Sequence, residues 1–99
     1  MSAVPAEMTA IAIREAGAPD VLIPEKRPVP QPGAGEILVK VAAAGINRPD
    51  VMQRKGLYPP PPGAPDIPGL EIAGTVVARG AGVSRWKDGD AVMALVAGG

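Results

Sequence analysis

A carboxylate, Glu71, lies inside an apolar stretch of the sequence, residues 70–77. Burying a charged group among apolar neighbours is unfavourable unless the charge is paired or hydrogen-bonded. Two roles are therefore open for Glu71. It either stabilises the fold by accepting hydrogen bonds from backbone amides or from an arginine, or it lies directly behind the groups that contact a substrate.

Asn47 and Tyr58 are the two other side chains that could take part in chemistry. They flank a predicted short helix, residues 47–55, whose first turn Asp50 is placed to cap. An amide at the start of a helix can donate a hydrogen bond to a carbonyl oxygen, although its simpler role is that of a helix cap. Tyr58 can stack on a planar molecule and donate a hydrogen bond, or it can simply pack against the fold.

Several kinds of chemistry are excluded by composition. The sequence contains no His and no Cys, so it has no imidazole base, no thiol nucleophile and no tetrahedral Cys/His zinc site. It also contains neither a G-x-G-x-x-G pattern nor a Walker A pattern, and therefore no recognisable nucleotide cradle. Acid–base chemistry would have to use Asp, Glu, Lys, Tyr or water.

Charge and hydropathy limit the possible partners. The ten basic and ten acidic residues cancel, so no basic field favours nucleic acid or an anionic membrane. No apolar run approaches the length of a membrane span. Residues 1–8 lack the regions of a signal peptide, and the absence of Cys leaves no disulfide framework. We therefore expect a cytoplasmic protein with no nucleic-acid partner and no membrane partner.

Short β-branched segments separated by Gly and Pro predict a mainly β fold with one short helix, arranged as a small β-barrel or sandwich. Prolines confine the second strand to an edge or to an extended connection. We expect Trp86 to cover one end of an otherwise aliphatic core. We expect a leader at residues 1–8 and one domain at residues 9–99. The domain has one helix at 47–55 and a stiff proline loop at 59–65. Its expected strands are 9–14, 21–27, 36–42, 70–77 and 91–96.

Three segments occur in a recognisable order: residues 45–58 (GINRPDVMQRKGLY), 68–77 (PGLEIAGTVV) and 86–92 (WKDGDAV). Together they resemble the N-terminal catalytic-domain segment of the medium-chain dehydrogenase/reductase superfamily, whose fold is the GroES-like barrel. Within that superfamily, the chain is similar to the zinc-free quinone oxidoreductase branch, especially the p53-inducible quinone-reductase-like group. The resemblance covers residues 8–99 and implies a GroES-like partial β-barrel.

The resemblance also predicts that there is no catalytic metal. In the zinc alcohol dehydrogenases of this superfamily, one strand opens with Gly-His-Glu, and its His binds the metal. Leu70 stands at that position here, and Asn47 stands where those enzymes place a Cys ligand. Leucine cannot bind a metal and asparagine is a poor ligand. We therefore expect hydride transfer from NADPH to a quinone or enone without zinc.

The resemblance gives individual residues a role. Asn47 and Tyr58 are the candidate catalytic residues, with Asn47 donating to a carbonyl oxygen or to the nicotinamide ribose. Arg48 is the second candidate for cofactor binding beside Asn47, although it could instead pair with Glu71 or be a solvated helix residue. The expected walls of the substrate pocket are Ile46, Met52 and Tyr58.

Members of this family carry a Rossmann domain after the barrel, and that domain binds NADPH. Its fingerprint does not occur in this chain. We therefore expect an N-terminal fragment of a reductase that is inactive alone and binds NADPH too weakly to detect. We also expect an unpaired strand edge near residues 91–96, which favours association into a homodimer.

Two other functions stay open. A zinc-free enoyl-thioester reductase uses the same architecture, and an assay that compares a quinone with an enoyl thioester separates the two. A non-enzymatic GroES-like binding module would need a mobile hydrophobic loop for its partner. The prolines in residues 59–65 stiffen the candidate loop, and this counts against such a module.

Overall fold

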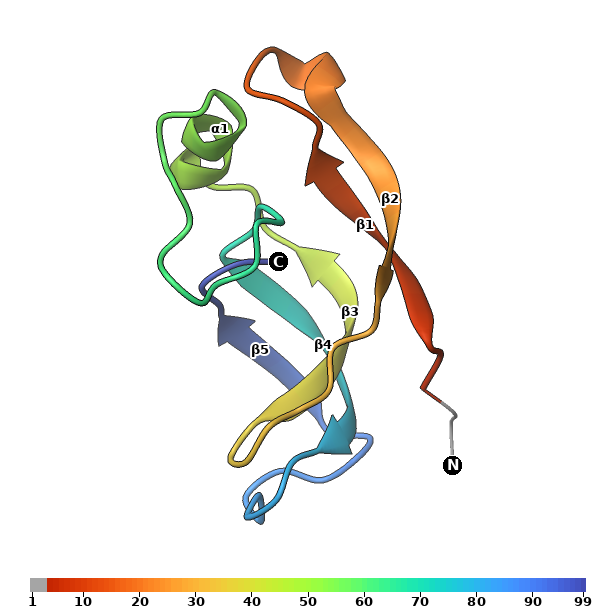
Figure 1. Ribbon diagram of the computed structural model, residues 1–99. Coiled ribbons are helices and arrows are strands. Elements are labelled where there is room, and N and C mark those ends of the chain that lie inside the picture. Colours follow the sequence, from red (N-terminus) through yellow and green to blue (C-terminus); the bar gives the residue numbers. More distant parts are fainter. Residues whose placement is uncertain (1–3) are drawn as a thin grey trace.

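The computed structural model describes residues 4–99 and is mainly β with one α-helix and one 3-10 turn. This confirms the predicted fold class. The strands form two antiparallel sheets, one of two strands and one of three (Figure 1). The elements are β1 (Glu7–Ile13), η1 (Pro19–Val21), β2 (Leu22–Pro28), β3 (Ile37–Ala44), α1 (Arg48–Arg54), β4 (Glu71–Arg79) and β5 (Ala91–Leu95).

The two-stranded sheet is a hairpin of β1 and β2. β1 begins at Glu7 rather than at Thr9, and Glu7 pairs with Pro28 at the far end of β2. The first strand therefore takes in two residues of the expected leader. Because both strands of a two-stranded sheet are edges, Pro24 and Pro28 interrupt no interior ladder, and β2 is an edge strand as predicted.

The three-stranded sheet has β4 at its centre and β3 and β5 at its edges. All five strands and the helix lie where the sequence predicts them, with ends that differ by at most two residues. β3 contains two register shifts, one of them between Val41 and Ala43, and such irregularities bend a strand. Gly74 allows β3 to pass close to β4, because a Cβ there would collide with the carbonyl oxygen of Lys40.

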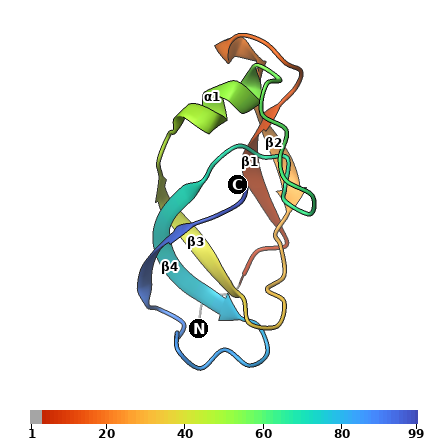
Figure 2. The same ribbon diagram turned by 90° about the vertical axis from the view of Figure 1, so that its left-hand side faces the viewer.

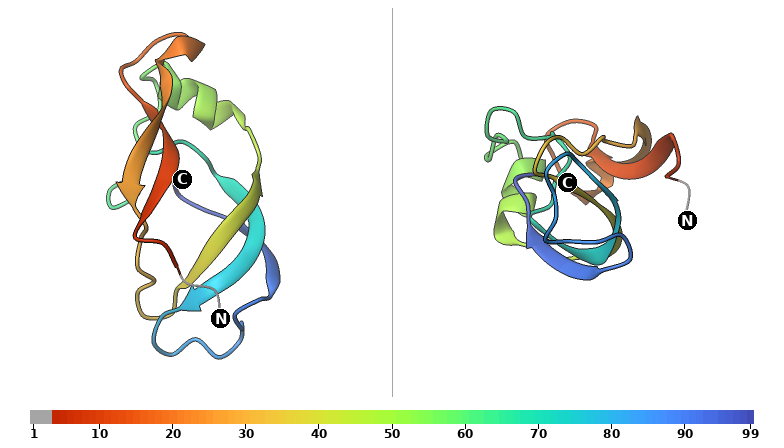
Figure 3. Two further views of the ribbon diagram at one scale, coloured as in Figure 1. Left: turned by 90° about the vertical axis from the view of Figure 1, so that its right-hand side faces the viewer. Right: turned by 90° about the horizontal axis from the view of Figure 1, so that it is seen from below.

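The two sheets face each other, and β5 lies on the side away from the β1–β2 hairpin (Figures 1 and 3). η1 and α1 lie at one end of the molecule, which we call the helix end (Figure 2). The turns of residues 33–36 and 80–90 lie together at the other end, which we call the turn end. Gly80 N–H donates to the Glu36 carbonyl at 2.8 Å, and Gly35 N–H donates to the Ala81 carbonyl at 2.9 Å.

The core is small and aliphatic. Its buried side chains come from β1, η1, β4 and the segment that precedes β4, so it lies between the two sheets. They are Ala12, Val21, Ile67 and Val76. No helix among residues 4–99 combines the length and the apolar character that a bilayer crossing requires, and α1 has only seven residues.

Trp86 does not cover the core, and this expectation was wrong. The side chain is exposed, and the guanidinium of Arg85 lies over its ring at 5.5 Å from the centroid. The last paired residues of β4 and β5 at this end are Thr75 and Ala91. Because Trp86 belongs to the turn beyond that pair, it stays outside the space between the sheets.

Candidate functional site

A polar contact between distant segments joins Asn47 to Glu71 at the helix end. The Asn47 Nδ2 donates to Glu71 Oε1 at 3.1 Å, across 24 positions of sequence. The carboxylate also lies directly against Gly45, where a Cβ would collide with Glu71 Oε1. A glycine between β3 and α1 therefore gives Glu71 its place, and Asn47 supplies the hydrogen bond that its partly buried charge requires.

Arg48 does not pair with Glu71, and this alternative was wrong. The partner of Glu71 is Asn47, and none of the ion pairs among residues 4–99 includes Arg48. Arg48 is exposed at the first residue of α1. Its guanidinium is therefore available to solvent or to a ligand.

Asp50 fixes the start of α1, as the sequence predicts. Its Oδ2 accepts the Asn47 N–H at 2.9 Å, and its own N–H donates to the Asn47 carbonyl at 3.0 Å. The other carboxylate oxygen, Oδ1, is buried and has no hydrogen-bond partner among the described residues. α1 ends before Gly56, whose φ of 81° is favourable for glycine.

A cavity of about 520 Å³ opens beside this contact, where β3 ends and β4 begins. Glu71 is its only charged lining residue, and the long side chains of Met93 and Leu95 make much of the wall apolar. Such a surface can hold a flat apolar molecule next to one polar group. The lining residues are Ala43, Ala44, Gly45, Glu71, Ile72, Ala73, Met93, Ala94 and Leu95.

The residues predicted to wall a substrate pocket lie elsewhere. Ile46 is 86% exposed, Tyr58 lies at the surface, and Met52 is half-buried on α1. None of the three lines the cavity beside Glu71. A cleft shared by Asn47 and Tyr58 therefore stays a prediction, and Met93 and Leu95 are cavity residues that the sequence analysis missed. Their alternation along β5 places them on one face, which is the signal that could have found them.

The proline loop that leads from α1 to β4 is fastened near its end. Arg27 Nη1 donates to Asp66 Oδ1 at 2.7 Å, and Arg27 Nε donates to Glu25 Oε2 at 2.6 Å. Gln53 Nε2 of α1 donates to the Asp66 carbonyl at 2.8 Å, and the next residue, Ile67, is buried. The Arg27 guanidinium lowers the pKa of the Asp66 carboxyl, and Asp66 and Glu25 together raise the pKa of Arg27. No pattern in the sequence connects Arg27 with Asp66, 39 positions away.

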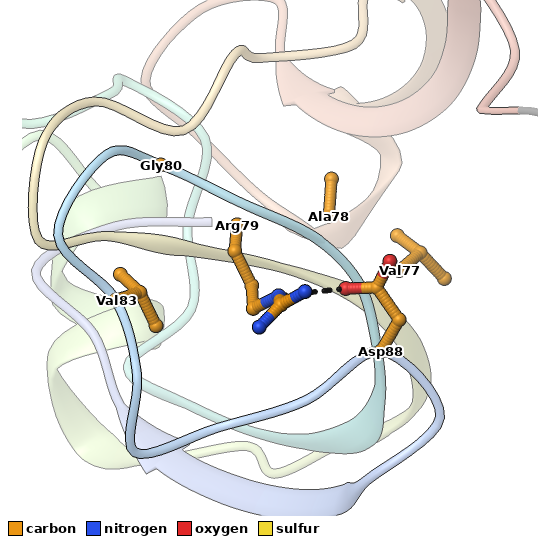
Figure 4. Close-up of a pocket in the computed structure, with 6 residues that line it drawn as sticks. All are labelled: Val77, Ala78, Arg79, Gly80, Val83 and Asp88. Atoms are coloured by element: carbon orange, nitrogen blue, oxygen red, sulfur yellow. Dashed lines mark hydrogen bonds and ion pairs between the residues drawn. The ribbon is translucent and has the colours of Figure 1, made fainter.

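A second cavity, of about 400 Å³, lies at the turn end (Figure 4). Arg79 crosses it and donates from Nε to Asp88 Oδ1 at 3.2 Å and from Nη1 to the Trp86 carbonyl at 3.3 Å. The guanidinium therefore already has partners in its own turn. Its lining residues are Val77, Ala78, Arg79, Gly80, Val83 and Asp88. Because none of these is a candidate from the sequence analysis, we place the candidate site at the helix end.

The donor set at the helix end does not suit zinc. Among residues 4–99, no three acidic side chains gather at one place, and His and Cys do not occur in the sequence. Zinc in proteins takes Cys, His and carboxylate ligands. Here Leu70 offers no donor atom, and the Asn47 amide is already hydrogen-bonded to Glu71.

The model of the alcohol dehydrogenase GroES-like domain matches residues 33–98. The chain belongs to this family. An alcohol dehydrogenase of Rhizobium meliloti (strain 1021) is 47% identical over 85 residues, which are 86% of this chain and 24% of that protein. A quinone oxidoreductase of Lama guanicoe is 41% identical over 95 residues, covering 93% of this chain and 29% of that protein. The chain thus spans about a quarter of the length of these curated relatives.

Solved structures agree with this membership of the alcohol dehydrogenase GroES-like family. The human synaptic vesicle membrane protein VAT-1 homolog-like protein has a TM-score of 0.82 at 38% identity, over 91% of this chain and 29% of that one. The quinone oxidoreductase from Coxiella burnetii has a TM-score of 0.80 at 31% identity, over 90% and 29%. A mycobacterial protein complexed with NADPH has a TM-score of 0.76 at 40% identity, over 90% and 28%. The predicted resemblance to an N-terminal segment of this superfamily is confirmed.

Proposed function

We propose that the chain is the N-terminal catalytic-domain segment of an NADPH-dependent quinone oxidoreductase that works without zinc. The observation that carries this proposal is the Asn47–Glu71 hydrogen bond at the wall of an apolar cavity. Asn47 does not itself line the cavity, but its partner Glu71 does, so the amide is one hydrogen bond away from the space proposed for a flat apolar acceptor. The quinone oxidoreductases among the relatives support the choice of acceptor.

The reaction is a two-electron reduction, in which a quinone and a proton take up a hydride and become a hydroquinone. NADPH, when bound, supplies the hydride. A carboxamide nitrogen carries two hydrogens, and Asn47 uses one of them for Glu71. The second can donate to the acceptor carbonyl oxygen, on which negative charge develops during the reaction. Water supplies the proton. A stacking role of Tyr58 on the quinone ring stays a prediction, because Tyr58 does not line the cavity beside Glu71.

Two residues support the zinc-free mechanism. Leu70 and Asn47 occupy the positions that correspond to the His and Cys ligands of the zinc enzymes, and neither provides a good ligand for zinc. A fixed amide takes over the task of stabilising the charge on the acceptor oxygen. Stoichiometric zinc in the purified protein, bound through Asn47 and Glu71, would contradict this part of the proposal.

This chain offers few groups to the cofactor. The exposed guanidinium of Arg48 fits a phosphate of NADPH, because a planar guanidinium binds phosphate oxygens well. Asn47 can reach the nicotinamide ribose in place of the acceptor. We propose that a Rossmann domain in the complete protein holds the remainder of NADPH, and that the complete protein is a cytoplasmic homodimer.

The test uses the complete protein that contains this chain, with NADPH and three acceptors: a quinone, an enoyl thioester and an aldehyde. We expect the quinone to be reduced fastest, and replacing Asn47 by Ala to lower kcat by about 100-fold because a charge-stabilising donor is lost. Gln31→Ala is the matched control, since Gln31 is an exposed amide in the loop before β3. Faster turnover of the enoyl thioester would favour the alternative reductase. Unchanged quinone turnover in Asn47→Ala would leave Asn47 as a structural residue only.

A further inference from the structure

The pairing of β3, β4 and β5 arranges six of the residues that line the cavity beside Glu71 in two rows. Residues that are directly opposite each other on adjacent strands share one face of a sheet. Successive rows on one face lie about 7 Å apart, because an antiparallel strand rises about 3.4 Å per residue. The first row is Gly45, Glu71 and Leu95, and the second is Ala43, Ala73 and Met93.

The height of the side chains changes across these rows. On β3 and β4 the second row consists of the methyl groups of Ala43 and Ala73. On β5 the long side chains of Met93 and Leu95 stand beside them, and these residues are 84% and 85% exposed. β5 is an edge strand among residues 4–99. The surface is therefore a shallow trough with a floor of Ala43 and Ala73 and an apolar wall of Met93 and Leu95, which we call the trough.

The charge and the length of the trough limit what it can hold. Glu71 is the only charged residue that lines the cavity, so an anionic group is repelled and an uncharged apolar group is favoured. The next row on the same face is polar, since Lys40 pairs with Thr75 there. This third row does not line the cavity. The apolar part of the face thus ends about 7 Å beyond Glu71.

The volume of the cavity exceeds the needs of a single ring. Cavities of about 300–1,000 Å³ accept drug-sized molecules, and this cavity measures about 520 Å³. A quinone ring beside Glu71 leaves the second row uncovered. The floor of the second row is low and its wall at Met93 is apolar, so the space left over suits a hydrocarbon chain.

We propose that the acceptor is a quinone with a short, uncharged alkyl substituent that lies over Ala73 and against Met93 while the ring lies beside Glu71. This inference rests on the proposed quinone reductase function and names the substrate class of the same site. A chain of about five carbons spans the distance of about 7 Å between the two rows. Each methylene that leaves water adds to the affinity until the chain reaches the polar row of Thr75.

The first test measures binding and needs no turnover. The complete protein, with ¹³C-labelled methionine methyl groups, is titrated with 2-pentyl-1,4-benzoquinone in the absence of NADPH, and Met93→Leu identifies the Met93 signal. We expect the Met93 methyl signal to shift, and 2-methyl-1,4-benzoquinone to shift it much less. Met8 on β1 and Met52 on α1 are internal controls, because neither lines the cavity. A Met93 signal that does not respond, for instance because another part of the complete protein covers it, would overturn the proposal.

The second test measures turnover with NADPH and a series of alkylated benzoquinones. We expect KM to fall by about twofold for each added methylene up to about five carbons and then to level off. A five-carbon chain that ends in a carboxylate should have a KM about tenfold higher than the pentyl compound, because Glu71 repels it. An equal KM for these two compounds would contradict an uncharged substituent.

Variants of the wall separate the trough from a general preference for apolar acceptors. Met93→Ala should lower the ratio of kcat/KM for the pentyl compound to that for the methyl compound by about fivefold, and Met93→Leu should keep the ratio. Ile11→Ala is the matched control, since Ile11 is an exposed apolar residue of β1 outside the cavity.

The outcomes distinguish this proposal from the proposed function. If the methyl and pentyl compounds are reduced equally well, or if Met93→Ala and Ile11→Ala have equal effects, the trough does not bind the substituent and the quinone reductase function stands. If no quinone is reduced by the unmodified protein, the proposed function fails, and the Met93 methyl signal still decides whether the trough binds an alkylated quinone.

Discussion

The helix end, taken together with the proline loop that follows α1, and the turn end of the molecule contain the same two kinds of contact. Each has an Arg–Asp ion pair: Arg27–Asp66 beside the proline loop and Arg79–Asp88 in the turn (Figure 4). Each also has an aspartate whose carboxylate accepts a 2.9 Å hydrogen bond from the backbone N–H of the residue three positions earlier. These aspartates are Asp50 in α1 and Asp90 before β5.

The two ends differ in the range of these contacts. At the turn end, Arg79 and Asp88 are nine positions apart, and they belong to one connection between adjacent strands. At the helix end, Arg27 of β2 and Asp66 of the segment before β4 are 39 positions apart, and Asn47 and Glu71 are 24 apart. A contact within one turn forms together with that turn. A contact between distant segments exists only when the whole fold is in place.

The largest expected effect is at the junction of β3 and α1. Gly45→Ala forces a Cβ against the side chain of Glu71 and should destabilise the fold by about 1–3 kcal/mol. Because the three atoms nearest to that Cβ all belong to the Glu71 side chain, the double variant Gly45→Ala/Glu71→Ala should be no less stable than Glu71→Ala. Urea unfolding of the three variants measures this coupling.

Gly35→Ala at the turn end is the control for this cycle. Its Cβ would meet no atom within 4 Å, but its φ is 77°, so its cost is backbone strain of about 1 kcal/mol. That cost should add to the cost of Glu71→Ala without coupling. If the losses of unfolding free energy in Gly45→Ala and Glu71→Ala were additive in the double variant, the carboxylate would not require the glycine.

A smaller difference is expected between Asp50 and Asp90. Asp50→Ala removes the cap of α1 and should cost about 1 kcal/mol in urea unfolding. The bond of Asp90 to the Lys87 N–H is exposed, so Asp90→Ala should cost about half as much. Asp50→Ala should also lower quinone reductase activity in the complete protein, because Asn47 loses its support, whereas Asp90→Ala should not. An equal loss of activity in both variants would contradict a special role of the helix end.

The sequence was sufficient to predict the strands, the helix and its cap, because these depend on local patterns: β-branched runs, glycine and proline at the turns, and Asp50 three residues after Asn47. It was also sufficient for the family. The partner of Glu71 could not be predicted, because alternatives as different as backbone amides and Arg48 satisfy a buried carboxylate equally well. The ion pair of Arg27 and Asp66 is beyond any local pattern, since only the tertiary packing brings β2 to the segment that follows the proline loop.

Trp86 and Ile46 show a further limit of what the sequence can predict. A large apolar residue is usually expected in a core, yet Trp86 and Ile46 are exposed here, whereas another isoleucine, Ile67, is buried. The reason is position. Trp86 lies in the turn beyond the last pair of β4 and β5, and Ile46 lies in the short link between β3 and α1. Neither connection faces the space between the sheets, so hydrophobicity alone does not decide burial.

The smallest and most specific effect concerns the titration of Asp66. The hydrogen bonds from Arg27 lower its pKa below the ordinary value of an aspartate. A carboxyl with a lowered pKa in the folded state contributes stability that is fully present above its ordinary pKa, and this contribution is lost as the pH falls through the lowered value. The Arg27–Asp66 ion pair is therefore present at neutral pH and is lost as the pH falls through the lowered pKa of Asp66. A carboxyl NMR titration of Asp66 should give a midpoint below about 3.9, the ordinary value for Asp.

In Arg27→Gln the midpoint should move up toward that value, since the neutral amide no longer favours the charged carboxylate, and in Arg79→Gln it should not move. An Asp66 midpoint that is the same with and without Arg27 would mean that the guanidinium does not hold the loop, and the two Arg–Asp pairs would then be equivalent surface contacts.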